Sequence, residues 1–351
     1  MNTPLPCDIK VLDNLLALNL NISMWSARKK LTMEDFGNVE LPPEELATLG
    51  SKRIAPPESL RVFGTLKARA FNYLDRHGVR FMSGWAIPEE KAADIVRELC
   101  NIRDEFQAAK EVFLKEYDTT IQDWIAKHAE WGSIIAGAVD SPDYVRSRMD
   151  FKWQMYKVAP LTAHEDNAAV VHAGLAEEVE NLGNTLFSEV SRTADEIWNR
   201  VYAGKTEVTH KALSPLRTLH NKLMGLSFVE PHVVPVADII RMAMKRIPKK
   251  GNITGDDLLT LQGVVCLLRD TKALLHHAER VISGYGPATV LDAVLAGAQN
   301  SVLSIPHPDS TGSEENTECG DNAEMEPADD APQFDPSSLP PSAQIPSMGL
   351  W

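Results

Sequence analysis

Residues 17–25 (ALNLNISMW) and 151–158 (FKWQMYKV) alternate between apolar and polar residues, which is the period-two pattern of a half-buried strand. A third segment, residues 79–87 (VRFMSGWAI), resembles them because it is rich in β-forming residues around Gly84. Because these segments lie far apart in the sequence, we expect them to form one small sheet that gathers the ends of longer helices.

Two long segments carry apolar residues at helical spacing. After Pro88 there is no proline or glycine until beyond His128, and the apolar residues advance in steps of four and three, as in the seam of a coiled coil (Ile95, Leu99, Ile102, Phe106, Ala109 and Phe113). Residues 165–203 carry a similar stripe, with Gly183 as a weak point (Leu175, Val179, Leu182, Leu186, Val190, Ala194, Ile197 and Val201). Two such helices with a strand between them predict an antiparallel coiled-coil pair within one chain.

Shorter helices are expected at residues 42–50, 57–77, 211–224, 233–247 and 255–283. The last begins at Thr254-Gly-Asp-Asp257, which is close to a capping box. The predicted fold class is therefore mainly α with a small β-sheet (α+β). Residues 1–160 would hold the three-strand sheet and the first long helix, and residues 161–285 the second long helix and a helical bundle, together forming one continuous body.

Residues 299–351 differ in composition from the rest: they hold ten acidic residues, eight prolines and no lysine or arginine. Ordering this segment costs on the order of 50–100 kcal/mol of backbone entropy, whereas burial of its few large apolar side chains returns roughly 15–30 kcal/mol. We therefore expect a disordered acidic tail. Its end resembles a short linear binding element, although a bare unstructured end is an equal alternative (Ile345, Met348, Leu350 and Trp351).

The tail accounts for most of the net charge of −14. Every lysine and arginine lies at or before Arg280, so residues 1–280 carry only −3 and a basic patch on the body is compatible with the acidic composition. The four cysteines stand far apart, which favours free thiols and a reducing compartment. No secretory signal and no apolar run of membrane-spanning length is present, and a cytoplasmic protein is expected.

Motifs that would indicate an enzyme are absent from the sequence. There is no GxSxG nucleophile turn and no glycine-rich phosphate loop, and the paired carboxylates resemble solvated helix faces. His276 and His277 are adjacent on one helix and point to different faces, while His164 and His172 are too far apart to chelate a metal together. We expect no catalytic residues, no metal site and no cofactor.

Basic clusters are the remaining candidates for a functional site. Arg28, Lys29 and Lys30 follow the first strand, and Lys52-Arg53 follows the first short helix. A third cluster contains no acidic residue between its members (Arg241, Lys245, Arg246, Lys249 and Lys250). Such clusters can contact nucleic acid or a partner protein, although cations at the end of a helix also complement its dipole.

Four blocks of sequence resemble a bacterial family of unknown function: Ile22-Ser-Met-Trp-Ser-Ala-Arg-Lys-Lys-Leu31, Leu41-Pro-Pro-Glu-Glu-Leu-Ala-Thr-Leu-Gly-Ser-Lys52, Gly78-Val-Arg-Phe-Met-Ser-Gly-Trp-Ala-Ile-Pro88 and Tyr144-Val-Arg-Ser-Arg-Met-Asp-Phe151. The resemblance covers most of residues 8–283. Members of that family are typically encoded in phages, plasmids and conjugative elements, beside a MoxR-type AAA+ ATPase and a von Willebrand A-domain protein like the cobalt-chelatase subunit. The resemblance implies a component of that ATPase system and supplies no catalytic residues.

The sequence and the resemblance together favour a non-enzymatic accessory or adaptor protein that acts with the AAA+ ATPase and the von Willebrand A-domain protein in a mobile genetic element. One alternative is a DNA-associated factor in recombination or plasmid maintenance, which would use the basic clusters. A second alternative is a helical membrane-active protein, against which the absence of an apolar hairpin argues.

Overall fold

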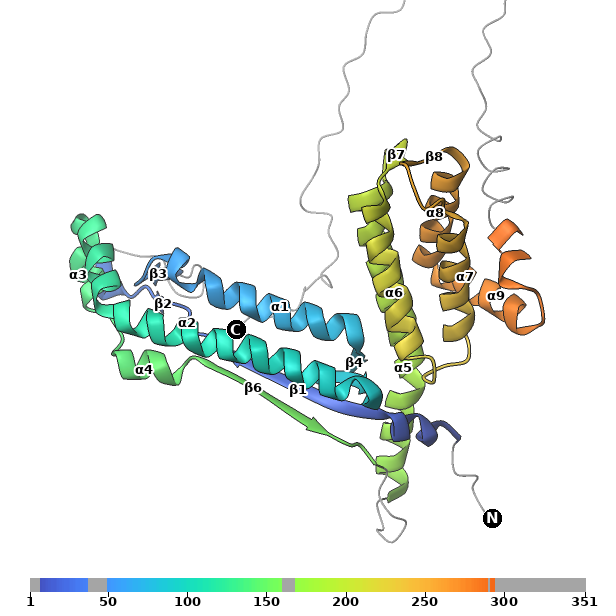
Figure 1. Ribbon diagram of the computed structural model, residues 1–351. Coiled ribbons are helices and arrows are strands. Elements are labelled where there is room, and N and C mark those ends of the chain that lie inside the picture. Colours follow the sequence, from blue (N-terminus) through green and yellow to red (C-terminus); the bar gives the residue numbers. More distant parts are fainter. Residues whose placement is uncertain (1–6, 37–48, 160–167, 290, 294–351) are drawn as a thin grey trace, which may run out of the picture. The chain divides into compact units, whose positions relative to one another are not determined.

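The computed structural model describes residues 7–36, 49–159, 168–289 and 291–293 of the chain (Figure 1). These residues form mainly helices with a small antiparallel sheet, which confirms the predicted fold class. The predicted short helix at 42–50 falls largely outside the described residues, and the predicted acidic tail at 299–351 lies wholly outside them.

The main sheet has four strands in the order β4-β5-β1-β6, all antiparallel. Their bounds are β1 Leu15–Ser23, β4 Val79–Phe81, β5 Gly84–Pro88 and β6 Asp150–Tyr156. The second predicted strand is a hairpin, because the chain turns at Met82, which has a positive φ of 51°. Gly84 follows the turn, and a Cβ there would lie 2.1 Å from the carbonyl oxygen of Leu18, so only glycine allows β5 to approach β1 this closely.

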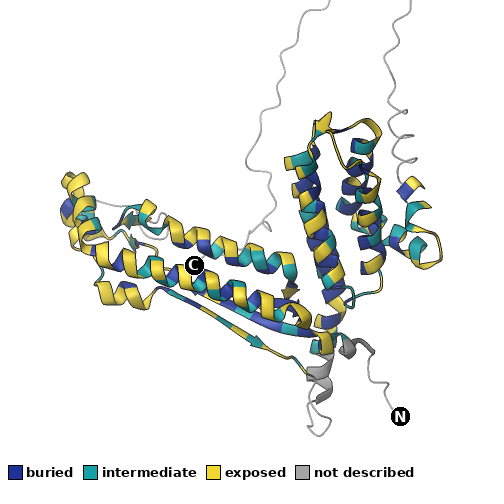
Figure 2. Ribbon diagram, in the orientation of Figure 1, coloured by how far each residue is buried: buried dark blue, intermediate teal, exposed yellow. Residues whose placement is uncertain are grey.

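Much of the central strand β1 is buried (Figure 2), and its first four residues are apolar on both faces of the sheet, whereas Asn21 and Ser23 near its end are exposed. Leu15 and Ala17 belong to one hydrophobic cluster, whereas Leu18, Leu20 and Ile22 belong to another. Because side chains of a strand alternate between its two faces, these two sets lie on opposite sides of the sheet. One strand therefore contributes to two separate cores.

Two helices cover the face of Leu18, Leu20 and Ile22 (Figure 1). They are α1 (Arg61–His77) and α2 (Ala92–Lys127). Phe63 of α1 stacks edge-on against Phe106 of α2, with 5.1 Å between ring centroids, and Phe106 also contacts Phe151 of β6. The predicted apolar stripe of α2 is thus buried against α1 and the sheet.

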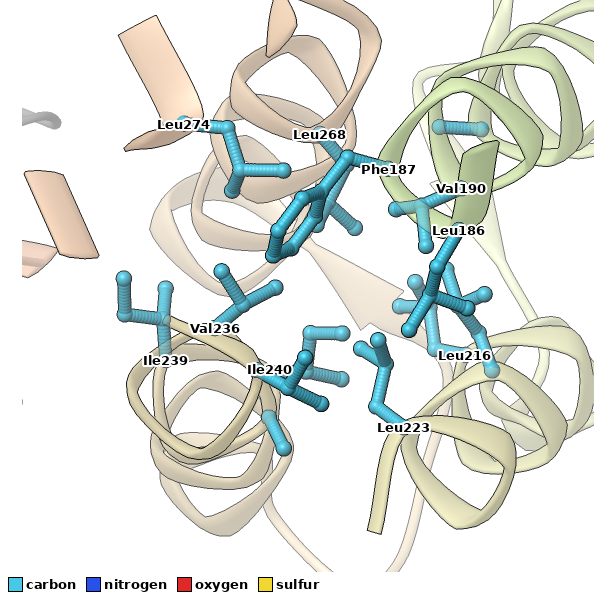
Figure 3. Close-up of a cluster of buried hydrophobic side chains, with 14 of the residues drawn as sticks. Leu186, Phe187, Val190, Leu216, Leu223, Val236, Ile239, Ile240, Leu268 and Leu274 are labelled. Atoms are coloured by element: carbon cyan, nitrogen blue, oxygen red, sulfur yellow. The ribbon is translucent and has the colours of Figure 1, made fainter. Parts of the chain in front are cut away.

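The other cluster is built around α5 (Ala168–Ile197) and its continuation, the π-helical turn η6 (Trp198–Tyr202). Four further helices pack with α5: α6 (Leu213–Gly225), α7 (Val233–Arg246), α8 (Gly255–Arg269) and α9 (Thr271–Ile282). Figure 3 shows Leu186, Phe187 and Val190 of α5 pointing toward side chains of these helices, among them Leu216, Leu223, Val236, Ile240 and Leu268.

The predicted antiparallel coiled-coil pair is wrong. The buried residues of α2 pack in the cluster on one face of the sheet, and those of α5 pack in the cluster on the other face. Both stripes are buried as predicted. However, α2 packs against α1, and α5 packs with helices α6 to α9. Gly183 of α5 leaves room for the segment after α6, because a Cβ there would lie 2.9 Å from Cγ of Glu230.

The helix predicted at 255–283 is two helices, because the chain breaks at Asp270. The Asp270 carboxylate accepts hydrogen bonds from the backbone N–H groups of Lys272 (3.0 Å) and Ala273 (3.1 Å), which caps the start of α9. Thr254, the expected cap, makes no such side-chain bond.

The remaining short helices are η1 (Cys7–Asn14), η2 (Met33–Phe36), η3 (Pro57–Leu60), η4 (Glu89–Lys91), η5 (Ala129–Trp131), α3 (Gly132–Ala136), α4 (Pro142–Ser147) and η7 (His210–Ala212). Two small sheets pair β2 (Arg28–Lys30) with β3 (Ser51–Arg53) and β7 (Glu207–Val208) with β8 (Ile253–Thr254). None of the helices within the described ranges combines the length and the apolar character that crossing a membrane requires.

A buried ion pair connects helices from the two sides of the sheet. The ammonium of Lys222 on α6 donates to Oε2 of Glu189 on α5 (2.7 Å) and to the backbone oxygen of Asp75 on α1 (2.7 Å). Glu189 Oε1 accepts from the backbone N–H of Arg80 in β4 (3.0 Å). The side chains of Lys222 and Glu189 are only 8% and 10% exposed. Both ends of the pair are satisfied by hydrogen bonds, which a buried charge requires.

We expect the Leu99→Ala and Leu186→Ala substitutions to cost about 2–5 kcal/mol each, as other core truncations do. Leu99 and Leu186 are both fully buried but belong to different clusters, so the double variant should lose the sum of the two within about 0.5 kcal/mol. Urea denaturation of the four proteins measures this coupling. A coupling above about 1 kcal/mol, as neighbouring residues show, would mean that α2 and α5 share one interface.

Lys222→Met should destabilise the protein by about 3–5 kcal/mol, because it leaves the carboxylate of Glu189 buried without a partner. Adding Glu189→Gln should recover part of this loss, since the amide oxygen can still accept from Arg80 while the buried charge is gone. The unfolding free energies of both variants test this, and a loss below about 1 kcal/mol for Lys222→Met would show that water reaches the pair.

Candidate partner-binding surface

Two of the predicted basic clusters pair with each other in the structure. Strand β2 holds Arg28, Lys29 and Lys30, and β3 holds Lys52 and Arg53. The antiparallel register places Arg28 opposite Arg53 and Lys29 opposite Lys52. Like charges directly opposite each other on neighbouring strands are destabilising unless an acidic group lies between them. The two pairs differ in their counter-ions.

The lysine pair is neutralised. Lys29 donates to Oδ1 of Asp140 (2.6 Å), and Lys52 donates to Oδ1 of Asp35 (2.5 Å). The hydrogen bond from Lys52 lowers the pKa of Asp35, followed by the bond from the backbone N–H of Thr32. Arg28 and Arg53 differ: both are exposed, and neither has an ion-pair partner among the residues that the structure describes. Lys30, on the same face as Arg28, is also exposed.

Asp140 fixes β2 to the end of α2. Its Oδ2 accepts from the indole N–H of Trp25 (2.9 Å), and its backbone oxygen accepts from the hydroxyl of Tyr117 (2.8 Å). Burial raises the pKa of Tyr117 to about 12, so the hydroxyl keeps its proton and remains a donor at neutral pH. The β2–β3 pair is thus attached to the body by a hydrogen-bonded network that includes two buried aromatic residues.

An aromatic pocket of about 310 Å³ adjoins β3. Trp124, Trp131 and Phe36 contribute their rings to it, and Lys52 and Arg53 form part of its wall. Trp131 is 57% exposed and Phe36 is 39% exposed. Trp124 is held in place, because its indole N–H donates to the backbone oxygen of Arg53 (3.2 Å) and its ring stacks against His128. Nε2 of His128 is buried and has no hydrogen-bond partner within the described part of the chain.

We call Arg28, Arg53, Phe36, Trp124 and Trp131 together the β2–β3 surface. The sequence indicated its cations but not its aromatic residues, because Trp124 continues the apolar face of a helix and nothing in the sequence connects it with β3. The two basic clusters were visible in the sequence, but their pairing is non-local.

The third basic cluster stands at the C-terminal end of α7, apart from the other two. Arg241 pairs with Asp238 (2.6 Å), and Arg246 pairs with Asp292 (2.6 Å). Lys245, Lys249 and Lys250 are exposed, and no ion pair is found for them within residues 7–36, 49–159, 168–289 and 291–293. Two of the five predicted cations, Arg241 and Arg246, are thus engaged in ion pairs. Those on the last turn of α7 complement its dipole. The candidate linear element (Ile345, Met348, Leu350 and Trp351) lies outside the described residues.

The histidines and carboxylates of the described ranges do not form a metal-binding cluster. No group of three or more His, Cys, Asp or Glu side chains there is placed to hold a metal ion. His276 and His277 stack on each other at 5.7 Å between ring centroids, and burial lowers the pKa of His277, followed by the charges of His276 and Arg280.

Comparison with known proteins gives one match. No curated protein and no solved structure matches the chain. A family model described as "Protein of unknown function (DUF3150)" matches residues 12–270, which include all of β2, β3 and the aromatic pocket. The match spans well over half of the 351 residues and confirms the expected membership of a family of unknown function. The chain therefore belongs to the DUF3150 family.

Proposed function

We propose that this protein is a non-enzymatic accessory protein that binds a MoxR-type AAA+ ATPase of a mobile genetic element through its β2–β3 surface, together with a von Willebrand A-domain protein. The observation that carries the proposal is the exposed arginine pair: Arg28 and Arg53 face each other across two strands without a counter-ion among the described residues. A carboxylate of a partner protein placed between them would remove their repulsion.

The composition of the β2–β3 surface supports a protein partner. Tryptophan and arginine are the residues most enriched among those that dominate binding energy in protein interfaces. Trp131 and Phe36 offer exposed apolar area beside the arginine pair. The network around Asp140 and the bond from Trp124 to Arg53 hold these groups before a partner arrives, which lowers the entropy lost on binding.

The identity of the partner rests on the resemblance of four sequence blocks to a family encoded beside such ATPases. Two of these blocks, residues 22–31 and 41–52, contribute β2 and part of β3. Of the β2–β3 surface, Arg28 lies within the first of these blocks, and Arg53 directly follows the second.

The test is retention on an immobilised MoxR-type ATPase from the same gene neighbourhood. The Arg53→Glu/Trp131→Ala variant should bind about thirtyfold more weakly or worse, because loss of one dominant interface residue costs about 2 kcal/mol or more. Arg217→Glu/Leu259→Ala is the matched control: it also changes an exposed arginine and an exposed apolar residue, but on α6 and α8. Equal retention of all three proteins, or equal loss in both variants, contradicts the use of the β2–β3 surface.

A DNA-associated factor is the second candidate. Lys245, Lys249 and Lys250 carry it, because these exposed cations have no acidic partner in the part of the chain that the structure describes. Binding through them would weaken steeply with salt, since each phosphate contact releases counter-ions. We expect little binding to duplex DNA at physiological salt. Submicromolar, salt-sensitive affinity that is lost on changing these three lysines to glutamate, without retention on the ATPase, would favour the DNA-associated factor instead.

A further inference from the structure

A cleft of about 450 Å³ lies beside the buried ion pair and is separate from the β2–β3 surface. Three helices form its walls: α1 contributes Arg76, α5 with its π-helical turn contributes Arg192 and Arg200, and α6 contributes Lys222. We call these four residues and the space between them the arginine cleft. Its volume is within the range of sites that bind small molecules.

The arginines of this cleft make no ion pair or side-chain hydrogen bond that would stabilise the described part of the fold. Arg76, Arg192 and Arg200 are exposed, and within the described ranges none of them has an ion pair or a side-chain hydrogen bond. Most other arginines near a carboxylate are paired: Arg69 with Glu98, Arg146 with Glu111 and Arg269 with Asp195. Three guanidinium groups around one hollow, with only Glu196 one helical turn from Arg192 and Arg200 to offset them, carry an excess of positive charge that an entering anion stabilises.

Carboxylates in the cleft do not cancel this charge. Asp75 and Glu196 line it, against three arginines, while the charge of Lys222 is balanced by Glu189. Asp75 is already occupied, because its Oδ1 accepts from the indole N–H of Trp85 (2.8 Å) and lies 3.1 Å from Nη2 of Arg80. The cleft is thus positive, although residues 1–280 as a whole carry a net charge of −3.

Two further groups lie beside the arginines. The pKa of His77, next to Arg76, is lowered by burial first and then by the charges of Lys91 and Arg76, whereas Asp94 raises it. Lys222 adds a further donor, because only two of its three ammonium protons are used, by Glu189 and by Asp75.

A second hollow of about 700 Å³ shares Asp75 and Arg192 with the arginine cleft. Along α5 it is lined by Asn181, Asn184, Thr185 and Ser188, whose side chains offer amide and hydroxyl groups. An anion held at Arg192 would therefore have neutral hydrogen-bonding groups next to it, which suits a ligand with a charged end and a polar body.

We propose that the arginine cleft binds a small phosphate-bearing molecule, with its phosphate between Arg76, Arg192 and Arg200 and its remainder along Asn184 and Ser188. Guanidinium groups match the geometry of phosphate oxygens through pairs of parallel N–H donors, and several around one group favour a dianion over a single carboxylate. This site is independent of the proposed ATPase partner, because none of its residues belongs to the β2–β3 surface.

Calorimetric titration of the full chain tests the proposal, with inorganic pyrophosphate and ADP as the two phosphate probes and citrate as a carboxylate probe of similar charge. We expect at least one of the phosphate probes to bind and to raise the melting temperature, and citrate to bind more weakly. Arg192→Gln and Arg76→Gln should each weaken binding by about tenfold or more, because each removes a charged hydrogen-bond donor.

The control is Arg217→Gln, which changes an exposed arginine of α6 that does not line the cleft, and it should bind like the unchanged protein. All three arginines are exposed and have no described partner, so the variants should melt at the same temperature without ligand. Absence of binding by both phosphate probes, binding of citrate as tight as that of phosphate, or equal affinity in all variants would overturn the proposal.

Discussion

The structure depends on strand β1, whose first four residues (Leu15 to Leu18) are apolar on both faces of the sheet. β1 is hydrogen-bonded to β5 on one side and to β6 on the other, and its side chains enter two different cores. A strand buried on both faces must be covered by helices on both faces. The chain meets this requirement with α1 and α2 on one face and with α5 and its bundle on the other. The separation of the two long helices follows directly from it.

The sequence was informative about which residues are buried and much less so about what they pack against. The steps of four and three in α2 predicted a buried stripe, and Leu99, Ile102 and Phe106 are fully buried. The same steps could not show what this stripe packs against. A second long helix and the combination of α1 with a sheet both offer an apolar surface. The alternation of residues 17–25 predicted a strand. Its apolar residues Leu18, Leu20 and Ile22 are buried as predicted, and Asn21 and Ser23 are exposed, but the second core that Leu15 and Ala17 enter was not predicted.

The candidate sites show the same division between local and non-local information. The basic clusters Arg28–Lys30 and Lys52–Arg53 were visible in the sequence, but their pairing is a contact across about twenty residues. Lys222 was missed, although it is a charged residue on the apolar stripe formed by Leu219 and Leu223, which is a signal of a buried ion pair. Arg76, Arg192 and Arg200 look like ordinary solvated helix residues until the fold brings α1, α5 and α6 together.

The two proposed binding regions share a physical origin. In each, arginines are brought together by backbone pairing or helix packing, and the fold leaves them without acidic partners among the described residues. The lysines at the same places, Lys29, Lys52 and Lys222, are all paired and serve the structure. This difference between neighbouring cations separates groups that stabilise the fold from groups available to a ligand or a partner.

Native-state hydrogen exchange of β1 tests the central claim most directly. If β1 joins the two cores, its backbone N–H groups that bond to β5 and β6 can exchange only when the whole body unfolds. Their opening free energy, and its dependence on denaturant, should then equal the values for global unfolding. Exchange of β1 through a smaller opening, while α8 or α2 stays protected, would contradict this account, because the cores would then be held together without the strand.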